Sequence, residues 1–335
     1  MLRKRWLILF SALCLFMGGC MHEVKAPQPK PAPVETPKHQ NISTQQVFPL
    51  TGLPAEGAVN HRVIAVMVNN HPKARPQSGL QKADIVYEVL AEGDITRLLA
   101  LYQSEFPKKV GPVRSARDYY IELSNGYHAL YVCHGWSPEA KAMLESGATD
   151  YLNGLFYDGT LFKRASFRTA PHNSYITFAN IEKGAAEKGY LLQDHIDPLP
   201  FRVDAPKGEQ VDKIDIIYSH RGYAQVQYKY VPDQKSYFRY SAGEQTIDYD
   251  THDPIQIQNV LVIAAKHNVI DSSGRRSIDL ASGGSGYLFQ NGIVKQIEWE
   301  NVNGRILPYE NGAPAGFMPG KTWINVVPDL NIVKW

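Results

Sequence analysis

The amino-acid sequence predicts an α+β protein, in which an N-terminal mixed-sheet α/β sandwich domain is followed by a mostly antiparallel β-domain. Up to about residue 200, apolar runs typical of buried strands are mixed with segments of helical spacing. After about residue 210, nearly every segment alternates as half-buried strands do. The residues between, 195–208, are rich in proline and have no period. We therefore expect an N-terminal domain over residues 47–200 and a C-terminal domain over residues 210–335.

Three strands are expected at the start of the first domain: residues 62–70, 84–90 and 95–103. The first contains a continuous apolar run, which is typical of a strand buried on both faces. The other two are separated by Glu92-Gly93, a plausible two-residue hairpin turn. With that turn, antiparallel pairing places Glu88 opposite Arg97, so we expect these two side chains to be adjacent.

Three helices and a further strand complete the first domain. Pro112 introduces residues 113–123, whose apolar residues have helical spacing, with Arg114 and Arg117 together on another face. Residues 129–133 are a short buried strand. A second helix is expected from Ser137-Pro138 to Gly147, and a third over residues 177–188. Helices flanking a mixed sheet make a layered α+β sandwich.

The second domain is expected to consist of strands separated by polar turns. Turn signals occur at residues 232–235 and at Asn291-Gly292. The expected strands are residues 213–219, 223–231, 236–240, 260–266, 277–281, 287–290, 293–299 and 322–327.

The N-terminus has the order of a bacterial lipoprotein signal. Arg3, Lys4 and Arg5 precede an apolar stretch of about a dozen residues, which is shorter than the roughly 20 residues of a spanning helix. Small residues then precede Cys20, the residue that we expect to carry the lipid. We predict that residues 1–19 are removed and that the acylated chain is held on the extracytoplasmic face of the cell membrane.

The residues after Cys20 predict a tether. Residues 20–46 contain five prolines among polar residues and have no apolar period, a composition typical of disorder. Alternating prolines favour an extended conformation at about 3.1 Å per residue, so such a tether reaches roughly 80 Å.

Charge and cysteine content narrow the possible partners. The chain has 35 basic and 33 acidic residues, and removal of residues 1–19 leaves 32 basic and 33 acidic. A near-neutral chain has no bulk attraction for nucleic acid, so no nucleic-acid partner is expected. Cys133 is the one cysteine of the mature chain that would stay unmodified, which predicts a buried, inert thiol and no intramolecular disulfide.

Several longer segments resemble the YerB-like bacterial lipoproteins. They are FPLTGLPAE, VMVNNHPKARPQSGLQKADIVYE, EGDITRLLALY, VGPVRSARDYY and RTAPHN in the first domain, and GYLFQNGIVKQIEWE and PGKTWINVVPD in the second. The resemblance covers nearly all of the mature chain and implies an exported two-domain lipoprotein. It carries over no catalytic residue, so the chemistry must be argued from the residues themselves.

A set of basic side chains at expected strand ends and helix starts suggests an anion-binding site. The candidates are Arg75, Arg114, Arg117 and His172. A planar guanidinium can hold a carboxylate or a phosphate through two parallel hydrogen bonds. The expected ligand is a cell-wall polymer, with an envelope protein as the other possible partner. The competing interpretation is structural, with Arg114 paired to Asp118 and Arg97 paired to Glu88.

A second function class is a cell-wall glycan hydrolase or lyase. Glu88, Glu92 and Asp94 could supply the two carboxylates that flank a glycosidic bond, although acidic residues are also common in turns. A nucleophilic Cys133 is disfavoured, because His134 follows it directly in a strand and points to the opposite face. The sequence has no HExxH and no close Cys/His set, so neither a metal nor a cofactor is expected.

Overall fold

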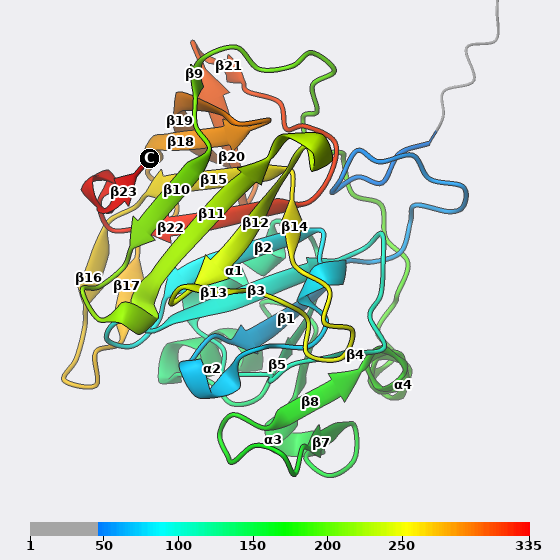
Figure 1. Ribbon diagram of the computed structural model, residues 1–335. Coiled ribbons are helices and arrows are strands. Elements are labelled where there is room, and N and C mark those ends of the chain that lie inside the picture. Colours follow the sequence, from blue (N-terminus) through cyan, green and yellow to red (C-terminus); the bar gives the residue numbers. More distant parts are fainter. Residues whose placement is uncertain (1–45) are drawn as a thin grey trace, which may run out of the picture. The chain divides into compact units, whose positions relative to one another are not determined.

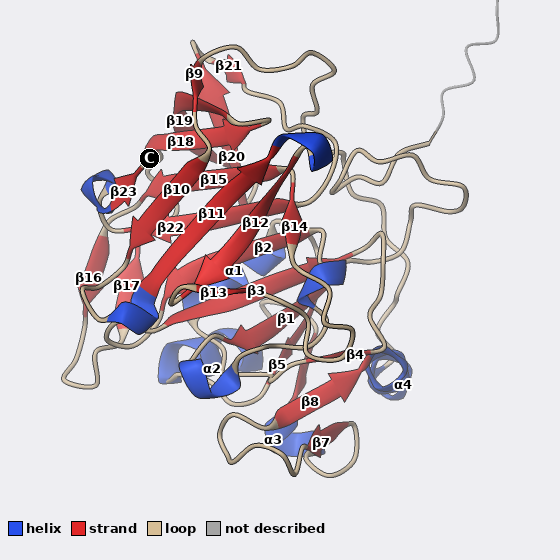
Figure 2. Cartoon of the chain, in the orientation of Figure 1, coloured by secondary structure: helices blue, strands red, loops and turns tan. Residues whose placement is uncertain are grey.

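The computed structural model describes residues 46–335 (Figure 1). The predicted signal peptide, Cys20 and the predicted tether up to residue 45 lie outside the described residues. Residues 45–335 form one compact unit. Among residues 46–335, no helix is long and apolar enough to cross a membrane. Strands dominate the described residues, with a few short helices at their margins (Figure 2).

A mixed sheet of twelve strands runs through both halves of the described chain. Its order is β21-β20-β19-β18-β15-β22-β2-β3-β1-β5-β6, with β9 paired to β19. The strands are β1 (Ile64–Asn69), β2 (Ile85–Leu90), β3 (Thr96–Tyr102), β5 (Leu130–Cys133), β6 (Tyr151–Asn153), β9 (Glu209–Gln210), β15 (Asn259–Ala264), β18 (Gly284–Gln290), β19 (Ile293–Val302), β20 (Arg305–Glu310), β21 (Ala313–Pro314) and β22 (Thr322–Val327).

The two expected domains meet within this sheet. β22, near the C-terminus, lies between β2 and β15 and is parallel to both. β1, β5 and β6 are also mutually parallel, while the remaining pairs of the sheet are antiparallel. The sheet is therefore mixed where the N-terminal strands lie and mostly antiparallel where the C-terminal strands lie, as the sequence predicts.

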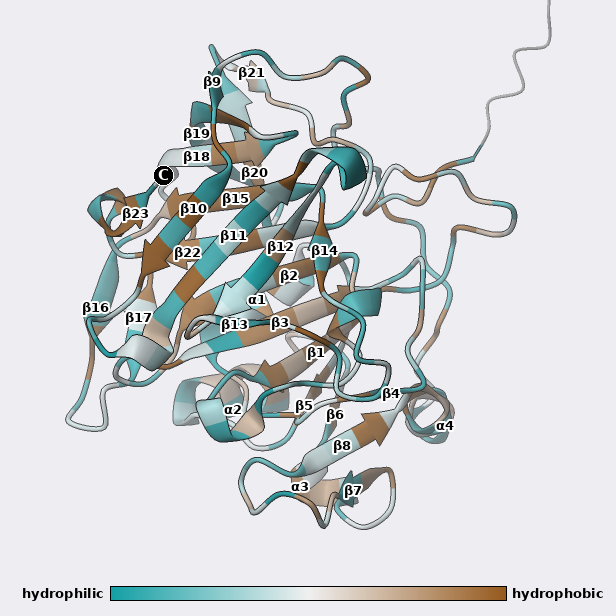
Figure 3. Cartoon of the chain, in the orientation of Figure 1, coloured by the Kyte–Doolittle hydropathy of each residue, from teal (hydrophilic) through white to brown (hydrophobic). Residues whose placement is uncertain are grey.

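A second, antiparallel sheet covers one face of the first. It comprises β10 (Lys213–Ile217), β11 (Gln225–Val231), β12 (Ser236–Ser241), β13 (Glu244–Gln245), β14 (Gln256–Ile257) and β23 (Val333–Lys334). Hydrophobic and hydrophilic residues alternate along its long strands (Figure 3), as expected when one face is buried and the other is solvated. Tyr228 and Tyr237 of its inner face share a hydrophobic core with Val86 and Trp323 of the large sheet.

Helices lie on both faces of the large sheet. The α-helices are α1 (Asp118–Asn125), α2 (Pro138–Glu145), α3 (Gly154–Tyr157) and α4 (Phe178–Lys188), and the 3-10 helices are η1 (Pro72–Ala74), η2 (Leu80–Lys82), η3 (Gly222–Ala224), η4 (Pro232–Gln234) and η5 (Leu330–Ile332). Tyr120 of α1 and Leu144 of α2 pack with Leu99 in the core opposite the second sheet. The cap of α2 is as predicted, because Ser137 accepts from Ala140 N. α4 has a cap of the same kind, because Thr177 accepts from Asn180 N.

Two small sheets complete the structure. β4 (Lys109–Val110) and β7 (Phe162–Arg164) flank β8 (Ser174–Thr177), beside α4. The hairpin of β16 (His267–Val269) and β17 (Arg276–Ile278) projects beyond β15 (Figure 1).

The predicted register of the β2–β3 hairpin is wrong by one residue. Glu88 lies opposite Leu98, and Arg97 lies opposite Val89. The turn is longer than expected, with Ala91 N bonded to Ile95 O. Because a shift of one residue reverses the face of every side chain, Glu88 and Arg97 point to opposite faces of the sheet instead of pairing.

The helix predicted over residues 113–123 begins only at Asp118. The residues before it are extended, because their backbone groups bond to neighbouring strands. Arg114 N donates to Met67 O, and Ala116 N donates to Gly135 O. These tertiary hydrogen bonds override the local helical spacing, so Arg114 and Arg117 do not share a helical face, and Arg114 is not paired with Asp118 at i+4.

Candidate anion-binding site

The carboxyl ends of β1 and β5 separate at one edge of the large sheet. The paired register of these two strands ends at Val66 and Val132. Residues 112–116 enter the gap that follows, with Val113 bridged to Val68 on one side and Ala116 bridged to Trp136 on the other. Arg114 is thereby held between the ends of two parallel strands, the position at which open α/β sheets bind ligands.

The guanidinium of Arg114 has few partners. Its Nη1 lies 3.4 Å from Ser115 Oγ, and no carboxylate of residues 46–335 forms an ion pair with it. Burial, followed by the neighbouring Arg97 charge, lowers the pKa of Arg114 to about 10. Arg114 remains a cation at neutral pH, so this half-buried charge is left for an external anion to neutralise.

Two stacked imidazoles lie close to Arg114. The rings of His71 and His172 have centroids 4.5 Å apart and are inclined by 25°. His71 follows the end of β1, and His172 lies in the loop between β7 and β8. Asn69, the last residue of β1, joins them, because its Oδ1 accepts from His71 N at 3.0 Å and its Nδ2 lies 3.0 Å from His172 Nδ1.

This hydrogen-bond network assigns the tautomers of both histidines. Asn69 Nδ2 can only donate, so His172 Nδ1 accepts and the proton of the neutral ring is on Nε2. His71 Nδ1 accepts from Lys73 N at 3.1 Å, so its proton is also on Nε2. Neither Nε2 has a hydrogen-bond partner among the described residues. The groups left for a ligand are therefore N–H donors, which suit an anionic oxygen.

Burial lowers the pKa of both imidazoles, and the surrounding cations lower it further. For His71, burial is followed by the effect of Lys73, and for His172 it is followed by the effects of His71 and Arg114. Both rings are therefore neutral at pH 7. A bound anion would offset the repulsion from the cations and raise both pKa values.

A third histidine adjoins the site but is not arranged as a catalytic base. His134 follows β5, and its Nε2 lies 2.9 Å from Nη2 of Arg164, which can only donate. The ring proton is therefore on Nδ1 and is donated to Ser174 Oγ at 2.8 Å. A serine is activated by a histidine nitrogen that accepts its proton, so this pair is not a nucleophile with its base.

Of the four predicted anion-binding residues, Arg114 and His172 are near enough for the Arg114 charge to lower the pKa of His172. Arg117 is buried and bonded to Glu92, which also holds Arg97 at 2.5 Å. Arg75 donates from Nε to Asn70 and from its terminal nitrogens to Tyr223 O at 3.3 Å. Arg75 and Arg117 are thus occupied by protein partners.

The sequence reasoning missed His71 as a member of the site. His71 directly follows the strand end Asn69-Asn70, a position that identifies it by the same argument that selected Arg75.

The three candidate catalytic carboxylates do not share a space that could hold a sugar: Glu88 and Asp94 line a cavity of only about 10 Å³, and Glu92 is not part of it. Glu88 is fully buried between the two sheets and bonded to Arg239. Glu92 lies on the opposite face of the large sheet, between Arg97 and Arg117. Asp94 accepts from Ser219 Oγ at 3.0 Å.

Neither Cys133 nor any cluster of possible metal ligands in residues 46–335 provides a further site. Cys133 is free and buried, and burial raises the pKa of its thiol. It is therefore protonated at neutral pH and unsuited to nucleophilic attack. Within residues 46–335, no group of three His, Cys, Asp or Glu side chains is placed to hold a metal ion.

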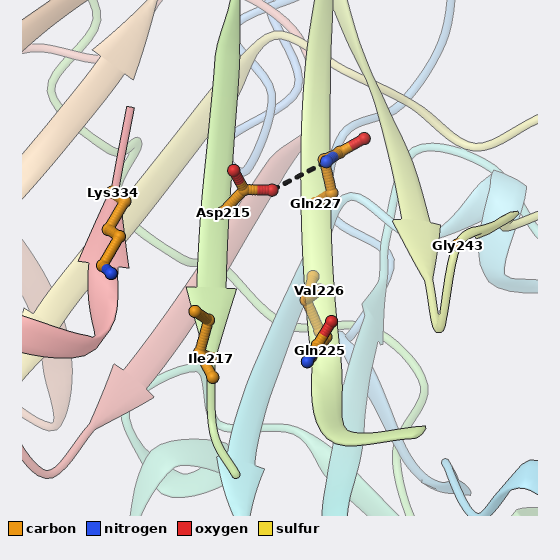
Figure 4. Close-up of a pocket in the computed structure, with 7 residues that line it drawn as sticks. All are labelled: Asp215, Ile217, Gln225, Val226, Gln227, Gly243 and Lys334. Atoms are coloured by element: carbon orange, nitrogen blue, oxygen red, sulfur yellow. Dashed lines mark hydrogen bonds between the residues drawn. The ribbon is translucent and has the colours of Figure 1, made fainter. Parts of the chain in front are cut away.

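A cavity of about 310 Å³ lies on the second sheet, over β10 and β11 (Figure 4). One of its two charged side chains, Asp215, is already paired within the chain. Asp215 accepts from Gln227 Nε2 at 2.7 Å and lies 2.6 Å from Lys213 Nζ. The residues that line the cavity are Asp215, Ile217, Gln225, Val226, Gln227, Gly243 and Lys334.

Fold and site together define a two-sheet α+β protein with a donor-rich site at the carboxyl edge of its parallel strands. Residues 50–191 match the N-terminal domain, and residues 214–324 the C-terminal domain, of the family described as "Protein of unknown function (DUF3048)". The chain belongs to the DUF3048 family.

A relative and a solved structure agree with this assignment. The chain is 52% identical over 286 residues to "Putative lipoprotein YerB" of Bacillus subtilis (strain 168), a match that covers 84% of this chain and 86% of the relative. The crystal structure of the YerB protein from Bacillus subtilis is similar with a TM-score of 0.83 and 50% identity, covering 87% of this chain and 99% of that one. The resemblance to the YerB-like lipoproteins is thus confirmed, and the relative's name supports a membrane-associated lipoprotein.

Proposed function

We propose that this chain is a lipid-anchored binding lipoprotein, which holds an anionic group of a cell-envelope polymer at the site formed by Arg114, His71 and His172. The observation that carries the proposal is the half-buried guanidinium of Arg114, which has no carboxylate partner among residues 46–335 and lies close to two neutral imidazoles. A buried cation without an internal counter-ion is unfavourable, and an external anion relieves that cost.

The chemistry of the site supports binding rather than catalysis. Its free groups are a guanidinium and imidazole Nε2–H groups, which donate hydrogen bonds, and its third imidazole donates to Ser174. Carboxylates of peptidoglycan stem peptides and phosphates of teichoic acids both fit such donors. The hydrolase or lyase alternative requires a carboxylate pair around one bond, whereas Glu88 and Glu92 lie on opposite faces of the sheet.

The proposed anchor follows from the sequence of the N-terminus. A lipid on Cys20 would hold the chain at the extracytoplasmic face of the membrane, and the proline-rich residues after it would let residues 46–335 reach the wall. The family relationship to a lipoprotein of Bacillus subtilis supports this location.

The test is binding of the soluble chain of residues 45–335 to purified wall sacculi. Arg114→Gln should weaken binding by at least about 1.5 kcal/mol, which is roughly tenfold, because it removes a charge-assisted hydrogen bond. Binding by the unsubstituted protein should weaken as salt is raised. Arg202→Gln is the matched control, since Arg202 is also half-buried and donates to a backbone oxygen, Asp204 O, far from the site in sequence.

The proposal fails if Arg114→Gln binds sacculi as the unsubstituted protein does. Mass spectrometry of the supernatant provides the second readout. Release of glycan fragments that depends on Glu88 or Glu92 would favour the hydrolase alternative instead.

A further inference from the structure

An exposed pair of stacked aromatic rings lies next to the proposed anion site. Phe167 and Tyr249 have ring centroids 4.7 Å apart and are inclined by only 1°. Phe167 is 49% exposed, although an isolated phenyl ring is usually buried. The backbone of Tyr249 is fixed in place, because its N–H donates to Gln77 O at 2.8 Å.

Arg168 links this aromatic pair to residues 73–76, which follow His71 of the anion site. Its guanidinium lies 5.6 Å from the ring centroid of Phe167 and 5.4 Å from that of Tyr249. The same group donates to Pro76 O at 2.5 Å and to Lys73 O at 3.3 Å. Phe167 and His172 also belong to one loop, between β7 and β8. Phe167 is five residues from His172 in this loop, and the charge of Arg168 lowers the pKa of His172.

A groove of about 460 Å³ lies over β4 and the residues that precede β14, and neither Phe167 nor Tyr249 lines it. Lys109 connects the two features, since its Nζ lies 5.3 Å from the ring centroid of Tyr175 and 6.0 Å from that of Tyr249. In the groove, Lys109 is paired with Asp250 at 2.8 Å. The lining residues are Gly79, Gln81, Lys82, Phe106, Pro107, Lys108, Lys109, Thr177, Asp248, Asp250 and Thr251.

The mixture of side chains in this groove fits sugar rings better than an anion alone. A pyranose ring presents a rim of hydroxyl groups, which donate and accept, and a face of C–H groups, which packs on an aromatic ring. Asp250 and Thr251 can accept from hydroxyl groups, and Lys109 can donate to them. Phe106, which lines the groove and is 38% exposed, and Phe167 of the neighbouring pair offer aromatic faces. A phosphate or carboxylate without a sugar would gain nothing from Phe167.

We propose that the groove and the Phe167–Tyr249 pair bind the sugar rings of the same polymer whose anionic groups are held by Arg114, His71 and His172. The ligand class is then an anionic glycan. This inference rests on the proposed function, because it takes the anion site as the neighbouring contact on one polymer.

The experiment compares three probes on the soluble chain of residues 45–335. The probes are purified sacculi, the same sacculi stripped of teichoic acid, and inorganic polyphosphate, an anion without sugar. Phe167→Ala should lower affinity for sacculi by roughly three- to tenfold, as expected for one aromatic contact, and leave polyphosphate binding unchanged. Phe167→Trp should restore binding to sacculi. Trp335→Ala is the matched control, because Trp335 is 44% exposed and packs on Tyr287, away from the groove.

Each outcome separates this inference from the proposed function. If Phe167→Ala binds sacculi as the unsubstituted protein does, or loses polyphosphate binding equally, the glycan surface is wrong and the anion site stands. If Arg114→Gln leaves all binding unchanged, the anion site is wrong. Loss of binding when teichoic acid is removed identifies a phosphate polymer as the anionic glycan, and retained binding identifies peptidoglycan.

Discussion

Glu88 and Arg239 form an ion pair in the interior of the protein, with Oε2 of the carboxylate 2.9 Å from Nη2 of the guanidinium. Their side chains are 0% and 1% exposed. Glu88 belongs to the large sheet and Arg239 to β12 of the second sheet, so the pair joins the N-terminal and C-terminal family regions. Trp323 Nε1 donates to the same carboxylate at 3.0 Å, which brings β22 into the network.

The first prediction concerns the stability that this pair provides. Glu88→Gln should lower the free energy of unfolding by about 3–5 kcal/mol, because it leaves the Arg239 charge buried without a counter-ion. Glu88→Met combined with Arg239→Met should recover much of that loss, since no charge then remains buried. Denaturant unfolding measures both. Glu105→Gln is the control, because Glu105 pairs with Lys82 and Lys321 at a partly exposed position and its loss should cost about 1 kcal/mol or less. A Glu88→Gln protein as stable as the control would contradict the account.

The second prediction is that ligand binding strengthens as pH falls toward the pKa values of His71 and His172, which lie below 6.5 in the free protein. Burial and neighbouring cations lower the pKa of His71 and His172 in the free protein. A bound anion raises these pKa values, so binding takes up protons and is favoured at lower pH. Titration of sacculi binding against pH measures the slope. His71→Asn with His172→Asn should flatten it, whereas an unchanged slope would place the titrating groups elsewhere.

The third prediction is an acid-dependent loss of stability from His267 in β16. Burial, with a smaller effect of Arg276, lowers the pKa of His267 to about 4, and neither ring nitrogen has a hydrogen-bond partner among the described residues. The unfolded chain protonates this imidazole below about pH 6.5, whereas the folded chain does so only near pH 4. The free energy of unfolding is therefore unaffected by His267 above pH 6.5. As pH falls from 6.5 toward 4, it decreases by about 2 kcal/mol, after allowance for the partial exposure of the ring.

Unfolding of a His267→Phe variant across this pH range checks the assignment. The variant should lose less stability on acidification than the unsubstituted protein does. His195→Gln, at an exposed position, should behave like the unsubstituted protein. Equal slopes for His267→Phe and the unsubstituted protein would refute the role of His267.

The fourth prediction concerns the proposed anchor. Cys20→Ala should abolish lipid labelling and leave the precursor uncut before that position, because the thiol that receives the lipid is missing. Radiolabelled fatty acid and the mass of the mature chain provide the readouts. Cys133→Ala is the matched control and should be labelled normally, since Cys133 is buried. Normal acylation of the Cys20→Ala protein would overturn the predicted lipoprotein signal.

Much of the fold follows from local patterns, because each strand or helix carries its own signature. The buried strand β1 is evident from its apolar run, and the caps Ser137 and Thr177 mark the starts of α2 and α4. The register of Glu88 and Arg97 was missed because it depends on one residue in a turn. The start of α1 was missed because the hydrogen-bond partners of residues 113–116 lie on β1, on β8 and just after β5, which no local pattern reveals.

The candidate site was only half predictable for the same reason. Arg114 and His172 are 58 positions apart and come within electrostatic reach of each other only because residues 112–116 enter between two strands. Composition cannot distinguish Arg114, which has no internal carboxylate among the described residues, from Arg117, which is held by Glu92. That distinction depends on tertiary geometry, which decides which cation is left for a ligand.

The position of β22 has a consequence for the order in which the large sheet can form. Synthesis proceeds from the N-terminus, so β2 and β15 leave the ribosome before β22. Until Thr322–Val327 has emerged, both neighbours present unpaired edges, which are prone to pair with other chains. The middle of the large sheet is therefore completed last, and a product cut short before β22 would be a target for chaperones and proteases.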